Sequence, residues 1–188
     1  MRKLLIVNGS PRKNGVCSSV SSMVADAVRK FDYETEIVNL CDLRINGCRA
    51  CMSCKSTGRC AQDDDMTQMY DRIRESDMVL FAAPIYFGAE CAQMKTMVDR
   101  FYAMIMDKDG QRLVNFGKVK KGATLLVCGA SDGQMIYGGV IGRYAKIFKS
   151  FDIADFTGYI LTGVTPDEVA DSDKVRDFIE SIEFQAEM

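Results

Sequence analysis

Four of the chain's eight cysteines fall within one 13-residue window with the pattern C-x2-C-x2-C-x5-C: Cys48, Cys51, Cys54 and Cys60. This spacing can bring four thiolates around one point without help from distant parts of the chain. Structural zinc usually takes two short Cys or His pairs separated by a longer span. Cysteines at x2 spacing suit a 4Fe–4S cluster better. The window therefore favours a cluster, with Cys60 as its fourth ligand.

Other interpretations of the window stay open at this point. The four thiols could form a redox-active thiol set, bind zinc or be inert. Arg49, Lys55 and Arg59 flank the cysteines, and their positive charges favour thiolates. Other cysteines are expected to be small buried hydrophobic residues, as free cysteine often is: Cys41, Cys91 and Cys128.

Composition narrows the chemistry further. The chain of 188 residues contains no histidine, which excludes Ser-His and Cys-His catalysis and the common histidine-based zinc sites. It is 47% hydrophobic and 27% charged, as globular domains are, and its net charge of −2 points to neither nucleic acid nor an anionic membrane. With no signal peptide or long apolar run, we expect a cytoplasmic protein whose cysteines stay reduced.

Apolar runs and helix-period patterns alternate along the rest of the chain. Strands are predicted at residues 3–8, 36–40, 78–83, 123–128 and 156–161. Helices are predicted at residues 18–31, from the Asp63–Asp65 run to about 75, and at 92–105, 136–151 and 172–185. The three aspartates are expected to cap their helix and face solvent. Residues 107–122 are predicted to form a polar loop, either a connection or an oligomer contact.

Strict alternation of apolar strands with helices predicts an α/β fold, with a parallel sheet covered by helices on both faces. Five strands favour the flavodoxin-like strand order 2-1-3-4-5. We expect one domain over residues 1–188, with a cysteine-rich insertion at about 46–62. In such a sheet, ligands bind at the carboxyl ends of the strands, near the point where the strand order reverses.

The loop after the first strand, residues 8–19, lies at that position and suits a phosphate group. Its hydroxyls and positive charges come from Ser10, Ser18, Ser19, Arg12 and Lys13. Together with the first N–H groups of the following helix, these groups can hold a phosphate. The loop is neither a Walker A motif nor a complete G-x-G-x-x-G fingerprint. The simpler alternative is a polar turn with a serine N-cap.

Two later loops can supply walls for a flat ring. The segment Pro84-Ile85-Tyr86-Phe87-Gly88 follows the third strand, and its aromatic and apolar groups suit a flavin. It could equally pack under the next helix. Cys128-Gly129-Ala130-Ser131 follows the fourth strand, where Gly129 permits close approach of the backbone to a ligand. Tyr86 could donate to a flavin or substrate oxygen, or simply form a wall.

Taken together, these motifs resemble the NAD(P)H-dependent FMN reductase superfamily, and within it most closely the iron–sulfur flavoprotein group. The matching segments are Gly9–Gly15, the cysteine window with Gly58, Asp64–Met66, Pro84–Phe87, Met94-Lys95 and Asp99–Phe101. The motifs cover roughly residues 3–103, and the remainder matches in architecture only.

The resemblance implies bound FMN and a homo-oligomer, either a dimer or a tetramer. It places Ser10, Arg12, Asn14, Cys17 and Ser18 near the FMN phosphate and Pro84–Phe87 at the ring. It implies that the four window cysteines hold a 4Fe–4S cluster that passes electrons to FMN. The family usually has Asn-Thr where this chain has Val16-Cys17. Because backbone donors remain there, we expect FMN still to bind, with lower affinity.

The leading hypothesis is an FMN-dependent oxidoreductase with NAD(P)H or ferredoxin as electron donor and a redox partner or small molecule as acceptor. A cluster-free NAD(P)H-dependent FMN or quinone reductase is one alternative. A non-enzymatic electron carrier and a cluster- or thiol-based redox sensor are two others. Turnover of NAD(P)H with quinone or ferredoxin would separate the enzyme from the carrier.

Overall fold

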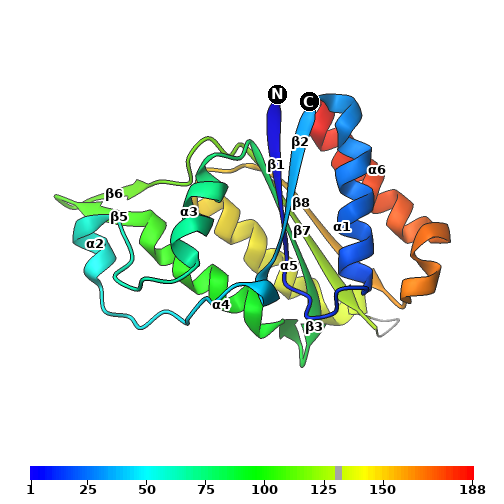
Figure 1. Ribbon diagram of the computed structural model, residues 1–188, viewed down its shortest axis with the longest axis horizontal. Coiled ribbons are helices and arrows are strands. Elements are labelled where there is room, and N and C mark those ends of the chain that lie inside the picture. Colours follow the sequence, from blue (N-terminus) through cyan, green and yellow to red (C-terminus); the bar gives the residue numbers. More distant parts are fainter. Residues whose placement is uncertain (130–132) are drawn as a thin grey trace.

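A parallel five-stranded sheet forms the centre of the computed structural model, which describes residues 1–129 and 133–188 (Figure 1). Its strand order is β2-β1-β3-β7-β8, which confirms the predicted flavodoxin-like order. The strands are β1 (Arg2–Asn8), β2 (Tyr33–Asn39), β3 (Met78–Tyr86), β7 (Lys121–Cys128) and β8 (Asp155–Thr162). Their apolar runs are buried because helices cover both faces of the sheet.

Helices lie on both faces of the sheet (Figure 1). One face is covered by α1 (Val16–Ala27) and α6 (Asp173–Glu187), and the other by α3 (Met66–Arg74), α4 (Ala92–Arg100) and α5 (Gly133–Ser150). Each face has its own cluster of buried apolar side chains. A short helix, α2 (Ser53–Thr57), lies in the cysteine window, away from the sheet. None of the helices in the described residues is long and apolar enough to cross a membrane.

Two hairpins were not predicted. Residues 107–122 are not simply a polar loop, because β5 (Ile105–Lys108) and β6 (Gln111–Val114) pair in an antiparallel hairpin. Its turn residues, Asp109 and Gly110, both have positive φ, as an Asp-Gly hairpin turn requires. The third strand also continues past Pro84 to Tyr86, and there it pairs with β4 (Ala89–Glu90).

Several predicted boundaries shift. The first helix starts two residues early, at Val16, and ends in a 3₁₀ turn, η1 (Val28–Phe31). The predicted helix 92–105 ends at Arg100, and η3 (Phe101–Met104) follows it. Two further 3₁₀ turns were not predicted, η2 (Leu40–Asp42) and η4 (Pro166–Asp171). The latter has a capping box between Thr165 and Glu168, which fixes the chain just after β8.

Candidate functional site

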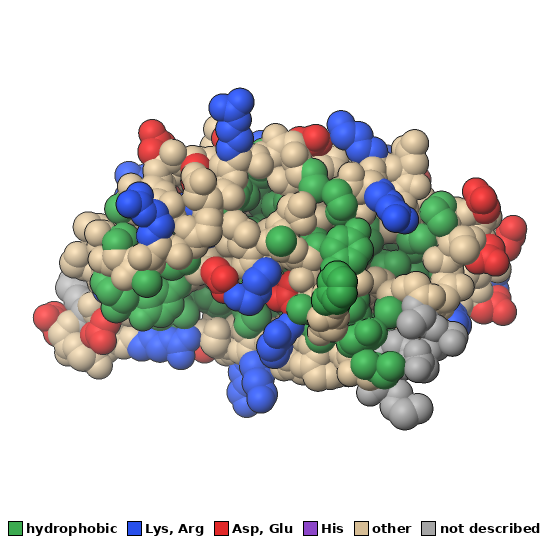
Figure 2. Space-filling view, turned by 90° about the horizontal axis from the view of Figure 1, so that it is seen from below, with side chains coloured by type: hydrophobic (Ala, Val, Ile, Leu, Met, Phe, Trp, Pro, Cys, Tyr) green, Lys and Arg blue, Asp and Glu red, His purple; other side chains and the backbone are tan. Residues whose placement is uncertain are grey.

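The carboxyl ends of the strands surround a hollow of about 750 Å³, here called the carboxyl-edge hollow. Its lining comes from the first loop, the end of β3, the end of β7 and the segment after β8. Figure 2 looks onto this side of the molecule and shows apolar side chains gathered there beside charged ones. A lining of apolar and polar groups at the carboxyl ends of the strands is typical of small-molecule and cofactor sites.

Eight of the predicted site residues line this hollow: Ser10, Arg12, Val16, Cys17, Pro84, Ile85, Tyr86 and Gly129. Three others do not. Asn14 is exposed, and Phe87 is fully exposed to solvent. The Ser18 hydroxyl accepts from the Asn8 amide and donates to the carbonyl oxygen of Arg12. Ala130 and Ser131, predicted as part of the third wall, lie outside the described residues.

Sequence reasoning missed four lining residues: Val127, Val164, Thr165 and Pro166. The last three follow the fifth strand and reach the same edge as the predicted loops. The capping-box pattern Thr165-x-x-Glu168 was a usable signal that the chain is ordered there.

A buried asparagine, Asn8, holds the first loop in shape. Its side chain accepts a hydrogen bond from the Ser10 N–H at 3.0 Å and donates to the Ser18 hydroxyl at 2.9 Å. The same amide donates to the Asn39 side chain at 3.0 Å, which ties the loop to the neighbouring strand. Asn8 is the last residue of β1 and is buried, so these bonds hold the first loop against the carboxyl edge of the sheet.

Helix α1 points its N-terminus at the carboxyl-edge hollow. Gly15 is its N-cap, not a serine as the simpler interpretation expected, and no side-chain hydrogen bond caps it. The free N–H groups of the first turn, with the guanidinium of Arg12, can bind an anionic group. Burial raises the pKa of the Cys17 thiol to about 12, so Cys17 presents a neutral thiol to the hollow.

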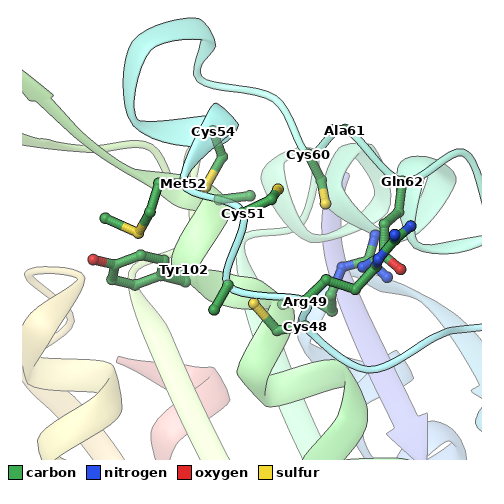
Figure 3. Close-up of a pocket in the computed structure, with 12 residues that line it drawn as sticks. Cys48, Arg49, Cys51, Met52, Cys54, Cys60, Ala61, Gln62 and Tyr102 are labelled. Atoms are coloured by element: carbon green, nitrogen blue, oxygen red, sulfur yellow. The ribbon is translucent and has the colours of Figure 1, made fainter.

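The four window cysteines line a second hollow of about 350 Å³, here called the cysteine hollow. Figure 3 shows Cys48, Cys51, Cys54 and Cys60 placed around it, with Met52 and Tyr102 at one side. The predicted grouping of the four cysteines therefore exists in the fold. Their sulfurs surround the hollow without converging. Among the described residues, no three Cys, Asp or Glu side chains are close enough together to hold a single metal ion.

The window is anchored to the core by residues that the sequence analysis placed in solvent. Asp64, expected on a solvated face, has a side chain only 4% exposed. Its carboxylate accepts hydrogen bonds from both Nη groups of Arg100, at 2.7 and 3.0 Å. It also accepts one from the backbone N–H of Asn46 at 3.0 Å. It also accepts the Met66 N–H at 3.2 Å, which partly supports its predicted role at the helix start.

A lysine makes a second anchor. The Lys55 ammonium donates to the carbonyl oxygen of Tyr102 at 2.7 Å and to that of Ile105, and lies 3.2 Å from the centre of the Tyr102 ring. These contacts join α2 to η3 and β5. Lys55 is therefore chiefly a structural contact.

The thiols of the window differ in environment. Hydrogen bonds from the backbone and side chain of Ser53 lower the pKa of the Cys51 thiol, and the charge of Arg49 adds a smaller effect. Burial raises the pKa of the Cys54 thiol, which outweighs the opposite effect of Lys55. Outside the window, Cys91 and Cys128 are buried as expected. Cys41 is not, because it lies exposed in η2.

The fold and the position of the carboxyl-edge hollow define a flavodoxin-like α/β protein. The profile of the NADPH-dependent FMN reductase family matches residues 2–135, and the chain belongs to that family. Its members are FMN-dependent oxidoreductases, and the same coarse class applies to this chain.

Several relatives of the chain are named iron–sulfur flavoproteins. An iron–sulfur flavoprotein of Archaeoglobus fulgidus is 31% identical over 91% of this chain and 73% of its own length. An iron–sulfur flavoprotein of Methanosarcina thermophila is 33% identical over 70% of this chain and 65% of its own length. The chain spans only about half the length of a third such relative, from Methanocaldococcus jannaschii, at 51%.

Solved structures support the fold alone. An NAD(P)H:quinone oxidoreductase from Methanothermobacter marburgensis superposes with a TM-score of 0.75 at 13% identity, covering 99% of this chain and 98% of its own. An FMN-dependent NADH-azoreductase from Bacillus anthracis, solved in complex with FMN, gives 0.72 at 14% identity over 100% of both chains.

Proposed function

We propose that this protein is an FMN-dependent oxidoreductase in which a 4Fe–4S cluster, held by Cys48, Cys51, Cys54 and Cys60, exchanges electrons with FMN. The observation that carries this proposal is the grouping of all four window cysteines around one hollow. FMN, when bound, supplies chemistry in which two electrons are taken up and released together or singly. The cluster would deliver them one at a time.

The carboxyl-edge hollow suits FMN in its chemistry. Arg12 and the first N–H groups of α1 would hold the phosphate, with Ser10 and Cys17 beside them. Pro84, Ile85 and Tyr86 would form one wall for the ring, and the backbone at Gly129 would approach from the other side. Adding a Cβ at Gly129 would meet nothing within 4 Å, so this position is open to a ligand.

The cysteine hollow suits a cluster better than a single zinc ion. Zinc holds thiolates at about 2.3 Å, which crowds the sulfurs around one point. A cubic cluster carries its irons at separate corners, so its ligand sulfurs stand farther apart. The spread of the four cysteine sulfurs around a hollow favours the larger group.

Helix α4 runs from the first loop, which lines the carboxyl-edge hollow, to the cysteine hollow. At the start of α4, the thiol of Cys91 donates to the carbonyl oxygen of Gly9 in the first loop at 3.0 Å. At the end of α4, Arg100 lines the cysteine hollow. A helix of nine residues rises about 14 Å, so α4 forms a rigid connection of that length between the first loop and the cysteine hollow. We also propose a homo-oligomer, in which the exposed Tyr86 and Phe87 are available for contact between copies.

NAD(P)H or ferredoxin would be the electron donor, and a redox partner or a small molecule the acceptor. The alternatives are a cluster-free NAD(P)H-dependent FMN or quinone reductase and an electron carrier without a substrate of its own. The charge balance of the chain, −2 overall, gives no reason to expect nucleic acid as a partner.

The test is a visible spectrum with iron and acid-labile sulfide analysis on protein purified without oxygen. We expect flavin bands with roughly four irons and four sulfides per chain. Replacing the four window cysteines by serine should remove iron and sulfide and retain FMN. Cys41→Ser, an exposed cysteine outside the window, is the matched control. Flavin without iron after anaerobic reconstitution would leave the cluster-free reductase, and absence of flavin would refute both.

NAD(P)H oxidation then separates enzyme from carrier. Steady turnover with quinone or ferredoxin as acceptor is expected for the enzyme. Electron exchange with a protein partner alone, without turnover, would identify the carrier.

A further inference from the structure

The cysteine hollow contains a buried positive charge. Arg100, the last residue of α4, lines the hollow with only 1% of its side chain exposed. A buried guanidinium is costly unless it is paired and hydrogen-bonded, and Asp64 supplies the paired charge from the start of α3. Arginine is suited to this position because its planar guanidinium group can bind a carboxylate through two parallel hydrogen bonds.

The hydrogen bonds of Arg100 use two of its three nitrogens. Nη1 donates to Asp64 and to the carbonyl oxygen of Asn46, each at 2.7 Å, and Nη2 donates to Asp64 at 3.0 Å. Nε is buried and has no hydrogen-bond partner among the described residues. Buried N–H groups are rarely left without an acceptor, so an unpaired one calls for an explanation.

The neighbouring cysteine is Cys60. Its thiol interacts electrostatically with both Arg100 and Tyr70, and the Tyr70 hydroxyl donates to the Arg100 carbonyl oxygen at 2.9 Å. Figure 3 shows Cys60 beside the other three window cysteines, with which it lines the hollow. Cys60 and the Tyr70 hydroxyl therefore both lie near the Arg100 side chain, and of these two groups only Cys60 lines the cysteine hollow with Arg100.

We propose that the Nε–H of Arg100 donates a hydrogen bond to the thiolate sulfur of Cys60 when a cluster occupies the hollow, and that this bond raises the cluster's reduction potential. The proposal rests on the proposed function. Hydrogen bonds to cluster sulfurs and nearby charge are among the factors that set such potentials. Reduction adds negative charge to the cluster, so a donor stabilises the reduced form more than the oxidised form.

Asp64 and Asn46 give Arg100 its position in this arrangement. They accept hydrogen bonds from both Nη groups and so fix the orientation of the guanidinium group. Only the Nε–H is then left to donate to the Cys60 sulfur. A purely structural role for the ion pair would anchor the window and leave the potential unchanged once the cluster is in place. The reduction potential therefore distinguishes the two roles.

The experiment is an anaerobic redox titration of the reconstituted protein and of Arg100→Lys. Lysine keeps the positive charge and can pair with Asp64, but its N–H groups all lie on one nitrogen, so it has no second nitrogen to place against Cys60 as Nε of arginine is placed. We expect the variant, with four irons per chain, to favour the oxidised cluster about tenfold more than the native protein, which is about 59 mV for one electron. Arg59→Lys, next to Cys60 but exposed and outside the lining, should leave the potential unchanged.

An unchanged potential in a fully loaded Arg100→Lys protein would overturn the proposal while leaving the proposed function intact. If this variant does not fold or load, the native protein labelled with ¹⁵N-arginine decides the question. Pulsed EPR of its reduced cluster should detect coupling to a ¹⁵N nucleus, and absence of that coupling would overturn the proposal. A native protein without iron after reconstitution refutes both proposals.

Discussion

The thiol of Cys91 donates to the carbonyl oxygen of Gly9 at 3.0 Å, and both groups are buried. The contact is tight, because a Cβ at Gly9 would lie 3.0 Å from the Cys91 sulfur and 3.1 Å from the Met94 Cβ. The first loop and the start of α4 therefore fix each other's position. A substitution in either one should change the affinity for FMN.

Cys91→Ala removes the donor and leaves the Gly9 carbonyl without this partner. We expect a loss of about 1 kcal/mol in the free energy of unfolding, which lowers Tm by roughly 2–4 °C for a chain of this length, and weaker FMN binding. Cys91→Ser keeps a donor and should lose less. Thermal unfolding and FMN titration measure both effects. Cys128→Ala, also a buried thiol, is the control, and an equal loss of FMN affinity in it would contradict the prediction.

Arg12 is predicted to recognise the FMN phosphate. Arg12→Ala should weaken FMN binding about tenfold or more, since a hydrogen bond to a charged group contributes roughly 1.5–3 kcal/mol. Riboflavin lacks the phosphate, so its binding should not change. Lys13→Ala is the matched control, because Lys13 pairs with Asp42 at 3.5 Å and does not line the hollow. Fluorescence titrations of both ligands in both variants decide the matter.

The Asp64–Arg100 pair should dominate the stability of the cysteine window. Asp64→Asn leaves a buried guanidinium without its charged partner, and we expect a loss of about 3–5 kcal/mol in the free energy of unfolding. Asp99→Asn breaks the exposed pair with Lys95 and should cost less than about 1 kcal/mol. Urea denaturation at neutral pH compares the two, and similar losses would refute the stronger role of the buried pair.

The same carboxylate predicts a pH dependence. Burial by itself raises the pKa of Asp64, but hydrogen bonds from Arg100, Asn46 and Met66 outweigh burial and hold it below its usual value of 3.8. Because the folded pKa is lower than the unfolded one, the stabilisation is complete above the unfolded value and is lost as the pH falls through the folded one. Unfolding free energies of the native protein should therefore fall below about pH 4, and more steeply than those of Asp64→Asn.

Backbone conformation in the window gives another prediction. Ala50 and Met52 have φ values of 50° and 63°. These values lie in the left-handed region, which is unfavourable for residues other than glycine. Ala50→Gly relieves this strain, and we expect a gain of about 0.5–1 kcal/mol in the free energy of unfolding. Ala61→Gly, also exposed but without positive φ, should instead be neutral or destabilising. Thermal unfolding of the two variants tests the difference in sign.

Much of the fold could be predicted because its strands are short apolar runs with little ambiguity. The segment Met78–Ala83 has no charged residue, which is typical of a central parallel strand. The hairpin at Asp109-Gly110 also had a local signal, the Asp-Gly pair, but the surrounding polar residues obscured it. The Asp-Gly turn therefore determines the local structure of this segment more than its polar composition does.

In the candidate site too, the features that local sequence determines could be predicted, and those that tertiary packing determines could not. The four window cysteines are close in sequence, so their grouping followed from spacing. Arg100 and Asp64 are 36 residues apart, and nothing in either segment indicates that the two side chains meet. In the sequence, Asp64 cannot be told apart from its neighbours Asp63 and Asp65. Only tertiary packing determines which of the three aspartates forms a buried ion pair. The prediction that Cys41 is buried was wrong for the same reason: its exposure depends on tertiary packing, and no local sequence pattern determines the exposure of a short 3₁₀ turn.

The two chain ends meet at the edge of the sheet that lies opposite the carboxyl-edge hollow. Arg2, at the start of β1, donates to the carbonyl oxygen of Ala186 at 2.9 Å, and Figure 1 shows both termini on that side. A peptide or anchor fused to either end would leave from the side away from the hollow. Attached to an electrode through either terminus, the protein would present its flavin edge outward to the solution.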